Sequence, residues 1–494
     1  MSWRSLMRNT VNDLPATKRR RLATLPAAAI ALAFATAPTG PPPDLDTILN
    51  GSISRNAFWG VYVQHVETGE TWYEHNASNA FLPASNQKIF TSATALDALG
   101  GDYRYRTVLY FDGQVEGSVL KGDLVLRGSG DPTFGSEQVR RRDPLRTWAA
   151  DLADMGIRRI EGRIVGDDNA FDDQPYAEGW DIDFVTSRAS REVGVSIGGL
   201  AYNDNVVLVS IRAGSPGRPP RVSMNPDGFL DFQNRMVTAN RRRGIAITTH
   251  RDFRNERITL QGSLPRTYNG TVGVPVANPT AFAAATFAKY LREAGIEVQG
   301  EPVDIDDLND FRYDREQPLF VYVSPPLLDI LNIVNKESNN FYAEQVFRTY
   351  ASNGSAQGAE NRIKQLLRRA GAATGDIEVR DGSGLSRKNM ITPRAMGNLL
   401  TYMHGHEQRE AFLASLARGG ERGSTLRYRL NRMPVRAKTG SLEFVRSLSG
   451  YVTTRDGQTL AFAVFANNCS GPSYRITQTI DRIVTELAAS SSPS

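Results

Sequence analysis

A serine and a lysine three residues apart, Ser85 and Lys88, are the residues of this sequence with the clearest chemical potential. Pro83 precedes the pair, and apolar residues recur at helical spacing after it until Gly100-Gly101. We therefore expect Ser85 at or near the amino-terminal end of a helix. Residues three apart share a helical face, so a neutral Lys88 amine can take the proton of the Ser85 hydroxyl. Burial of Lys88 beside other cations would lower its pKa enough for that role.

The Ser-x-x-Lys pattern is weak evidence by itself, because it recurs at Ser118 to Lys121. That second copy lies in a stretch of alternating apolar residues with several glycines, which is typical of a β-hairpin. Two side chains three apart in a strand do not share a helical face. The alternative interpretation of Ser85 and Lys88 is a helix cap followed by an exposed lysine, and other motifs are needed to decide.

Two further short motifs can complete a site with this pair. Ser338-Asn339-Asn340 falls at a break between two predicted helices, where a loop can direct a hydroxyl and an amide into a cleft. Lys438-Thr439-Gly440 falls on a predicted strand, and its glycine lets a ligand backbone lie close. Each is poor evidence separately, since Ser54-Arg55-Asn56 also matches the second motif and a strand lysine is commonly an exposed residue that protects an edge. Chance seldom provides all three in the order helix, loop and strand.

The elements around the motifs form two mixed blocks on either side of a β-rich segment. A hairpin is predicted over residues 58–74, ahead of the Ser85 helix, and helices alternate with loops over 325–404. Three strands follow between residues 435 and 467, and a helix over 473–487 ends the pattern. Residues 103–275 are rich in strand patterns and turns. We expect the amino-terminal hairpin to complete the sheet formed by the carboxy-terminal strands.

In this layout, the three motifs resemble those of the penicillin-recognising active-serine enzymes. The chain is most similar to the D-alanyl-D-alanine carboxypeptidase/endopeptidase family, the class C low-mass penicillin-binding proteins of the penicillin-binding protein 4 type. The long separation of Ser85 and Ser338 fits that family, which carries large domains between its first two motifs. Four other stretches resemble the family: Gly128-Ser129-Gly130-Asp131-Pro132, Ala201-Tyr202-Asn203-Asp204-Asn205, Asp381-Gly382-Ser383-Gly384-Leu385-Ser386, and Lys438 through Tyr451.

The resemblance implies an α+β fold. A penicillin-binding, β-lactamase-like transpeptidase domain, with an antiparallel sheet and helices on both sides, would carry a large β-rich insertion. The peptidase domain would comprise residues 44–102 and 300–490, and the inserted domain or domains residues 103–299. Residues 488–494 form a polar tail for which we expect no ordered structure.

The resemblance also implies a role for the residues of the first two motifs. Ser85 would attack the carbonyl between two D-alanines of a peptidoglycan stem peptide, with Lys88 as general base. Ser338 would relay the proton to the leaving amine, and Asn340 would bind the substrate amide. Water would then hydrolyse the acyl-enzyme, and no metal or organic cofactor is expected.

The third motif is implied to bind the substrate. Lys438 would supply a positive field for the terminal carboxylate and hold the serine of the second motif, while the Thr439 and Ser441 hydroxyls bind that carboxylate. Gly440 belongs to the same substrate-binding strand. Backbone NH groups of Ser85 and Ser441 would form the oxyanion hole, which is worth about 3 kcal/mol per donor. A β-lactam would acylate the same serine and stay, because its tethered leaving group obstructs deacylation.

The excess positive charge of the chain belongs to an amino-terminal leader. The formal net charge is +5, and residues 1–35 hold six basic residues and one acidic residue, so the remainder is balanced and predicts no nucleic-acid partner. Basic residues Lys18 to Arg21 precede an apolar run, Leu22 to Phe34, that is too short to span a bilayer, and Ala33-Phe34-Ala35 offers a cleavage site. We expect a cleaved export signal and a periplasmic or cell-envelope location. The alternative is an uncleaved signal anchor, and the carboxy-terminal end shows no amphipathic anchor helix.

Metal and disulfide chemistry have little support. The five histidines form neither a His-x-x-x-His nor a His-Glu-x-x-His pattern. The acidic stretch Asp304 to Asp310 lacks the glycine and terminal glutamate of a calcium loop, so we expect a solvated connector. The single cysteine, Cys469, follows an apolar run, and we expect a buried, inert thiol.

Three other functions were weighed against the carboxypeptidase. Gly194-Val195-Ser196-Ile197-Gly198 matches the nucleophile elbow of α/β-hydrolase esterases, but the next residues predict turn and strand where that motif requires a helix. A serine β-lactamase would keep the fold, although the long insertion argues against it. A non-catalytic peptidoglycan-binding protein would use the cleft without chemistry. Carboxypeptidase trimming and D,D-endopeptidase cleavage of crosslinks would use the same residues, and the sequence favours neither.

Overall fold

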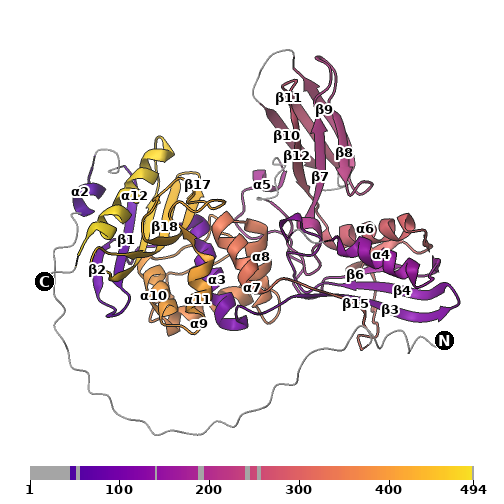
Figure 1. Ribbon diagram of the computed structural model, residues 1–494, viewed down its shortest axis with the longest axis horizontal. Coiled ribbons are helices and arrows are strands. Elements are labelled where there is room, and N and C mark those ends of the chain that lie inside the picture. Colours follow the sequence, from indigo (N-terminus) through magenta and orange to yellow (C-terminus); the bar gives the residue numbers. More distant parts are fainter. Residues whose placement is uncertain are drawn as a thin grey trace, which may run out of the picture. The chain divides into compact units, whose positions relative to one another are not determined.

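The computed structural model describes residues 45–51, 56–139, 142–186, 194–239, 245–252, 257–316 and 318–491 (Figure 1). The predicted export signal, residues 1–35, lies outside the described residues, as does the last part of the predicted tail, residues 492–494. In the part of the chain that is described, no helix combines the length and the apolar character needed to cross a membrane.

A six-stranded antiparallel sheet forms the centre of the predicted peptidase domain. Its strands, in spatial order, are β16 (Ala417–Arg418), β17 (Val435–Leu442), β18 (Val445–Thr453), β19 (Thr459–Asn467), β1 (Phe58–His65) and β2 (Thr71–His75). The prediction that the amino-terminal hairpin completes this sheet is confirmed, because β1 pairs with β19 from Phe58 opposite Asn467 to His65 opposite Leu460.

Helices cover both faces of this sheet, as the α+β prediction requires. Figure 1 shows α12 (Ser473–Ala489) on one face and α10 (Pro393–His404) on the other. The side chains of β19 alternate between the two layers: Phe462 and Val464 pack in the cluster that includes α12, whereas Phe465 packs in the cluster that includes α10. A period of two is the pattern of a strand that is buried on both faces.

The remaining elements of the peptidase domain are helical. They are α2 (Leu45–Leu49), η2 (Ala84–Asn86), α3 (Gln87–Leu99), α7 (Leu327–Asn332), a π-helical turn η6 (Ile333–Glu337), α8 (Asn340–Thr349), α9 (Ala356–Arg369) and α11 (Arg409–Ser415). Ser338 adopts a left-handed conformation, with φ of 65°, between η6 and α8. The side chain of Asn339 then caps α8 by accepting from the backbone NH of Tyr342. The predicted break between two helices is therefore only two residues long.

The insertion contains a seven-stranded sheet with two helices. Its strands are β3 (Arg106–Glu116), β4 (Val119–Arg127), β5 (Arg159–Ile160), β6 (Ile164–Asp167), β13 (Glu297–Val298), β14 (Pro302–Asp304) and β15 (Pro318–Val323), and its helices are α4 (Pro144–Asp154) and α6 (Pro279–Glu293). Because β14 pairs with β6 and β15 pairs with β3, this sheet extends to Val323, beyond the predicted domain boundary at residue 299.

Two three-stranded sheets and several short elements complete the insertion. One sheet has the order β12 (Asn269–Pro275), β7 (Val206–Arg212), β8 (Arg221–Asn225), and the other has the order β10 (Ala246–Asp252), β11 (Arg257–Leu264), β9 (Asp231–Thr238). The short elements are η3 (Glu137–Val139), α5 (Ile182–Thr186), η4 (Asn203–Asn205) and η5 (Ile305–Asp307).

Helix α8 ties the insertion to the peptidase domain. The buried Gln345 side chain donates to the carbonyls of Gly198 and Gly130, at 2.9 and 3.3 Å, and accepts from the backbone NH of Gly198. On the same helix, the Tyr342 hydroxyl donates to Ser136. The guanidinium of Arg348, which is 1% exposed, pairs with Asp172. Buried polar side chains that are bonded across two domains fix their relative register.

The carboxy-terminal end agrees with the sequence in one respect and differs in another. Cys469 is buried, as predicted, and its thiol donates to the Ala466 carbonyl at 3.3 Å. Helix α12 runs to Ala489, so the predicted tail that starts at residue 488 begins later than expected. The backbone NH of Ser490 bonds to the carbonyls of Glu486 and Leu487, which extends the last turn.

Candidate active site

The serine and the lysine of the first motif lie at a helix start, as predicted. Ser85 belongs to the short turn η2, and Lys88 follows in the first turn of α3. The Lys88 amine is fully buried and donates to the Ser85 hydroxyl at 3.1 Å. It also donates to Asn340 Oδ1 and to the Ser383 carbonyl, each at 2.6 Å. These three acceptors fix the amine beside the hydroxyl that it could deprotonate.

Burial lowers the pKa of Lys88 to about 7, and the nearby carboxylates of Asp381 and Glu344 oppose this shift. A buried ammonium loses its hydration, so the neutral amine is favoured. The sequence predicted a contribution from neighbouring cations, but the structure assigns the lowering to burial. A substantial fraction of Lys88 is therefore neutral at neutral pH and able to accept a proton.

The second and third motifs meet through a contact between Lys438 and Ser338. The buried Lys438 amine of β17 donates to the Ser338 hydroxyl and to the Thr439 carbonyl, each at 2.8 Å. Burial is the main cause that lowers the pKa of Lys438 well below its usual value, and the charge of Lys88 adds to it. The left-handed backbone at Ser338 turns the chain between η6 and α8, and its hydroxyl lies within reach of this amine.

Gly440 has a role that the sequence did not indicate. A Cβ at this position would lie 2.1 Å from the Ser447 hydroxyl oxygen and 2.8 Å from the Pro83 carbonyl oxygen. The glycine therefore allows β17 to approach the turn that carries Ser85, where the prediction had a ligand backbone. Two hydrogen bonds fasten this contact, from Asn86 Nδ2 to the Lys438 carbonyl at 2.9 Å and from Ser447 to the Pro83 carbonyl at 2.7 Å.

The loop that follows α9 supplies Asp381, an acidic residue that lies in one of the stretches resembling the family but for which the sequence suggested no role. The carboxylate of Asp381 is buried and accepts from the backbone NH groups of Gly384 and Ser386, at 2.8 and 2.7 Å, and from Asn389 Nδ2 at 2.7 Å. It also accepts from Trp180 Nε1 of the insertion at 2.9 Å. Asp-Gly-Ser-Gly is a turn sequence, so the sequence does contain a signal for this loop.

Glu344 of α8 is the second acidic residue that sequence reasoning missed. Its buried carboxylate accepts from the backbone NH groups of Gly382 and Ser383, at 3.0 and 2.8 Å. Burial is the main cause that raises its pKa to about 7, with the charge of Asp381 as a second cause. Because Ser383 in turn accepts from Lys88, Glu344 positions the loop that holds the lysine.

These residues lie at a cavity of about 820 Å³. Of the predicted site residues, Ser85, Ser338, Asn340, Thr439 and Ser441 line it. The predicted residues Lys88, Lys438 and Gly440 lie behind this surface, fully or nearly fully buried. Residues Asp181 to Phe184 of the insertion line the cavity as well, with Arg387. The volume is in the range of sites that bind small organic ligands.

The other sequence matches are not part of this site. Lys121 lies in the β3–β4 hairpin and pairs with Glu116, as expected for the second Ser-x-x-Lys copy. Ser196 is fully buried and donates to the Val276 carbonyl at 2.8 Å, and the residues directly after it, 197–202, form no helix. It therefore lacks the exposed strand-to-helix turn of a nucleophile elbow. Ser54 and Arg55 of the third match lie outside the described residues.

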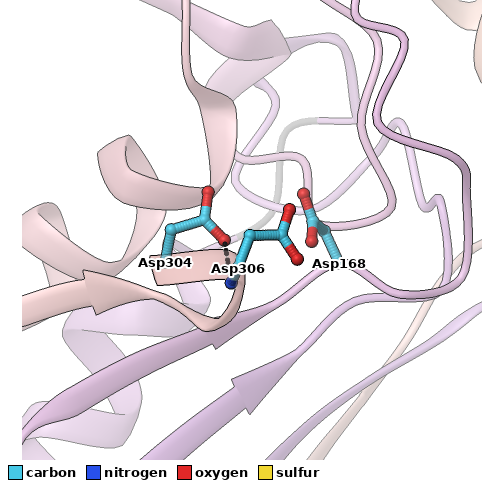
Figure 2. Close-up of side chains that lie close together, drawn as sticks. All are labelled: Asp168, Asp304 and Asp306. Atoms are coloured by element: carbon cyan, nitrogen blue, oxygen red, sulfur yellow. Dashed lines mark hydrogen bonds between the residues drawn. The ribbon is translucent and has the colours of Figure 1, made fainter. Parts of the chain in front are cut away.

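The acidic stretch after residue 303 differs from the predicted solvated connector. Figure 2 shows Asp304 and Asp306 beside Asp168, and a ligand oxygen from each lies within 4.8 Å of the others. Asp304 is only 6% exposed. Its carboxylate accepts hydrogen bonds from the side-chain amide of Asn278 and from the backbone NH of Asp306, and the second bond caps η5. Burial is the main cause that raises the pKa of Asp168 to about 7. This acidic group belongs to the insertion and does not line the cavity of Ser85.

Comparison with known proteins decides the family. The model of the D-Ala-D-Ala carboxypeptidase 3 (S13) family matches residues 43–487. The chain belongs to this family. The resemblance of the three motifs to the D-alanyl-D-alanine carboxypeptidase family is therefore confirmed.

Relatives and solved structures agree over nearly the whole length. A D-alanyl-D-alanine carboxypeptidase of Actinomadura sp. is 30% identical over 468 residues, covering 90% of this chain and 84% of the relative. The D-alanyl-D-alanine carboxypeptidase DacB of Haemophilus influenzae is 27% identical over 427 residues, covering 83% of this chain and 85% of the relative. The crystal structure of penicillin binding protein 4 from Haemophilus influenzae matches with a TM-score of 0.76 at 25% identity, covering 90% of this chain and 99% of that one. This carboxypeptidase family member is therefore a serine-type hydrolase with the predicted α+β fold.

Proposed function

We propose that the protein hydrolyses the D-Ala-D-Ala bond of peptidoglycan stem peptides through an acyl-enzyme on Ser85. One observation carries this assignment: a buried lysine with a pKa of about 7 lies 3.1 Å from a serine hydroxyl that lines a cavity. A base whose pKa is close to the working pH is effective in proton transfer. Membership of the D-Ala-D-Ala carboxypeptidase family supports the substrate class.

Acylation uses the two lysines and the two serines together. Ser85 Oγ attacks the carbonyl carbon as its proton moves to Lys88 Nζ, and the carbonyl oxygen becomes an oxyanion. The carbon–nitrogen bond then breaks, and Ser338 passes a proton to the nitrogen of the departing D-alanine. Lys438, which donates to Ser338, supports that transfer. Asn340 keeps its amide oxygen on Lys88 and lines the cavity, so we place its amide nitrogen toward the substrate peptide.

The strand β17 binds the carboxylate end of the substrate in this proposal. The hydroxyls of Thr439 and Ser441 line the cavity and are placed to donate to a terminal carboxylate. The buried amine of Lys438 donates to the Thr439 carbonyl, and in its protonated form its charge favours an anion beside these hydroxyls. Backbone NH groups of Ser85 and Ser441 form the oxyanion hole. Water then hydrolyses the ester, which releases the shortened peptide and restores Ser85.

A β-lactam enters by the same route. The matching structure of penicillin binding protein 4 from Haemophilus influenzae has also been solved in complex with a β-lactam, and it aligns with a TM-score of 0.72. The β-lactam nitrogen stays tethered to the acyl group after ring opening, so it obstructs the approach of water. We therefore expect a long-lived adduct on Ser85.

The test is mass spectrometry of the protein after incubation with a penicillin. The expected result is one adduct, located on the peptide that contains Ser85 and absent from Ser85→Ala. Ser118→Ala is the matched control, because it removes the serine of the other Ser-x-x-Lys copy and should keep the adduct. An adduct that persists in Ser85→Ala, or no adduct on the wild-type protein, would contradict the proposal.

Location and crosslink cleavage extend the proposal. We infer export to the periplasm or cell envelope from the basic and apolar leader, and cell fractionation with a carboxy-terminal tag tests it.

The same acyl transfer chemistry acts on D,D-crosslinks, where the departing group is a second peptide. Incubation with purified crosslinked and uncrosslinked muropeptides, followed by chromatography, measures the balance between the two reactions.

A further inference from the structure

A second cavity, of about 480 Å³, lies at the other end of β17 from the active site. The first residues of β17, Val435 and Arg436, line this second cavity, whereas Thr439 and Ser441 line the first. The end of α10, the helix α11, the edge strand β16, the loop before β17 and the strands β18 and β19 contribute the remaining walls. We call this cavity the basic pocket, because of the side chains that line it.

Four arginines and one histidine line the basic pocket: Arg409, Arg418, Arg432, Arg436 and His404. Among the described residues that line it, none is an aspartate or a glutamate. His404 contributes no fixed charge at neutral pH, because burial and the charge of Arg409 lower its pKa. The four guanidinium groups give the basic pocket a charge of about +4, since arginine stays protonated in proteins.

Protein carboxylates compensate part of this charge, because Glu421 and Glu410 lie close enough to act on Arg436. In the described part of the chain, no carboxylate pairs with the guanidinium of Arg418, Arg432 or Arg436. Arg409 pairs with Glu410 at 2.9 Å, but that glutamate is 84% exposed, and exposed pairs contribute little. The nearby Glu421 is already held by Lys336 at 3.1 Å.

Two of the arginines show the cost of this arrangement. Nε of Arg409 is buried and has no hydrogen-bond partner, and its NH2 group lies 3.2 Å from Nε2 of His404. Arg436 donates to the Leu413 carbonyl at 2.9 Å, and burial together with the charge of Arg418 lowers its pKa, whereas the carboxylates of Glu421 and Glu410 oppose this shift. Cations that lie together with unfilled donors cost free energy, which a bound anion would recover.

We propose that the basic pocket binds a phosphate ester of a sugar or polyol. The planar fork of arginine matches phosphate oxygens bidentately, and a phosphate monoester carries close to two negative charges at neutral pH. The cavity is larger than inorganic phosphate requires and has apolar walls, from Leu413, Met433 and Tyr451, for the uncharged part of the ligand. This inference is independent of the proposed catalytic function, because no residue of the basic pocket lines the active-site cavity.

The experiment compares binding of glycerol phosphate to the wild-type protein and to the double variant Arg418→Gln/Arg432→Asn by isothermal titration calorimetry at low ionic strength. Both side chains are exposed, so the variant is expected to fold. Asparagine also suits the left-handed backbone at Arg432, where φ is 60°. We expect affinity to fall at least about tenfold, which corresponds to about 1.4 kcal/mol.

Arg362→Gln, an exposed arginine of α9 outside the basic pocket, is the matched control and should bind as the wild type does. Penicillin acylation should be the same in all three proteins. Absence of glycerol phosphate binding, equal binding by the double variant, or equally tight binding of the carboxylate analogue glycerate would overturn the proposal.

Vesicles distinguish the two sources of such an ester. Sedimentation with vesicles that contain phosphatidic acid, whose headgroup is a phosphate monoester, but not with phosphatidylcholine vesicles, and its loss in the double variant, would identify a lipid headgroup. Binding of glycerol phosphate without vesicle binding would identify a soluble or polymer-borne phosphate ester. Either outcome supports the basic pocket as the binding site.

Discussion

Lys88 and Glu344 carry opposite charges when ionised, and burial moves the pKa of each to about 7. Burial disfavours the charged form of both groups, so it lowers the pKa of the amine and raises that of the acid. The Ser383 backbone lies between them, since it donates to Glu344 and accepts from Lys88. The charge state of the site therefore changes within the neutral pH range.

The first prediction concerns the pH dependence of acylation. The second-order rate constant for acylation by a penicillin should rise as the pH increases through about 7, because only the neutral Lys88 amine accepts the Ser85 proton. The measurement is stopped-flow acylation between about pH 5 and about pH 9. Lys88→Met should react about 100-fold more slowly or worse and lose this pH dependence. A rate constant that falls with rising pH would contradict Lys88 as the base.

The second prediction separates a positioning role from a catalytic one. Glu344→Gln keeps a carbonyl oxygen for one of the two NH groups, that of Gly382 or that of Ser383, but it removes a negative charge that, with that of Asp381, raises the pKa of Lys88. The rise of the acylation rate should therefore shift to lower pH. Thermal unfolding of the variant checks that the loop is intact. An unchanged pH profile at reduced rate would indicate a purely structural role.

Short sequence motifs identified the residues whose side chains carry the proposed chemistry. They did not identify Glu344, whose side chain acts by accepting hydrogen bonds from the backbone of a distant loop. Ser85, Lys88, Ser338 and Lys438 belong to short patterns, and the structure brings these four together. Glu344 is one of many helix residues in the sequence, and only folding places its carboxylate against two NH groups of a loop distant in sequence. No local pattern can carry such a contact.

At the scale of elements, the short turn η2 is enclosed by segments that approach it through glycines. A Cβ on Gly440 of β17 would lie 2.8 Å from the Pro83 carbonyl oxygen, and one on Gly384 would lie 1.9 Å from the Ala84 carbonyl oxygen. Gly384 also has a φ of 84°, which favours glycine. Strand and loop therefore contact the nucleophile turn directly, and no side chain separates them.

The third prediction follows from this contact. Gly440→Ala should push β17 away from η2 and lower the acylation rate at least about tenfold, with a loss of about 1–3 kcal/mol in the free energy of unfolding from overpacking. The rate is measured by stopped flow and the stability by urea unfolding. Gly375→Ala is the control, because an added Cβ there meets nothing within 4 Å. Equal effects of the two substitutions would show that the close approach is unimportant.

The sequence predicted helices and strands correctly where these are long enough for a periodic pattern of apolar residues. The three strands of residues 435–467 and the helix α10 lie where the sequence placed them, since each is long and periodic. Two-residue strands such as β5 and β13 carry no period, so the sequence could not show the parallel pairs they form. The sequence also did not predict that the Asp304 side chain is buried, because the residue that bonds to it, Asn278, is distant in sequence.

At the scale of the whole molecule, helix α8 serves both the active site and the insertion. Asn340 and Glu344 of this helix contact Lys88 and its loop, while Tyr342, Gln345 and Arg348 contact the insertion. One rigid helix thus belongs to two domains. A substitution that removes contacts between α8 and one domain should therefore also destabilise the other domain.

The fourth prediction tests that coupling. Gln345→Ala leaves the NH and carbonyl of Gly198 and the carbonyl of Gly130 without their partner, so the free energy of unfolding should fall by about 2–3 kcal/mol. Calorimetry should still show one cooperative transition for both domains. Gln357→Ala, on the exposed surface of α9, should change little. Two separate unfolding transitions in the wild-type protein or in Gln345→Ala would argue against a helix shared by the two domains.

The lone buried thiol of Cys469 has a practical consequence for such measurements. With one cysteine in the chain, 6% exposed and bonded to Ala466, the native protein should give almost no background reaction with maleimides. Any cysteine introduced on the surface would then be modified selectively, without first removing a native one. Pairs of spin labels or fluorophores, one on the insertion and one on the peptidase domain, can therefore report the distance between them while a penicillin is bound.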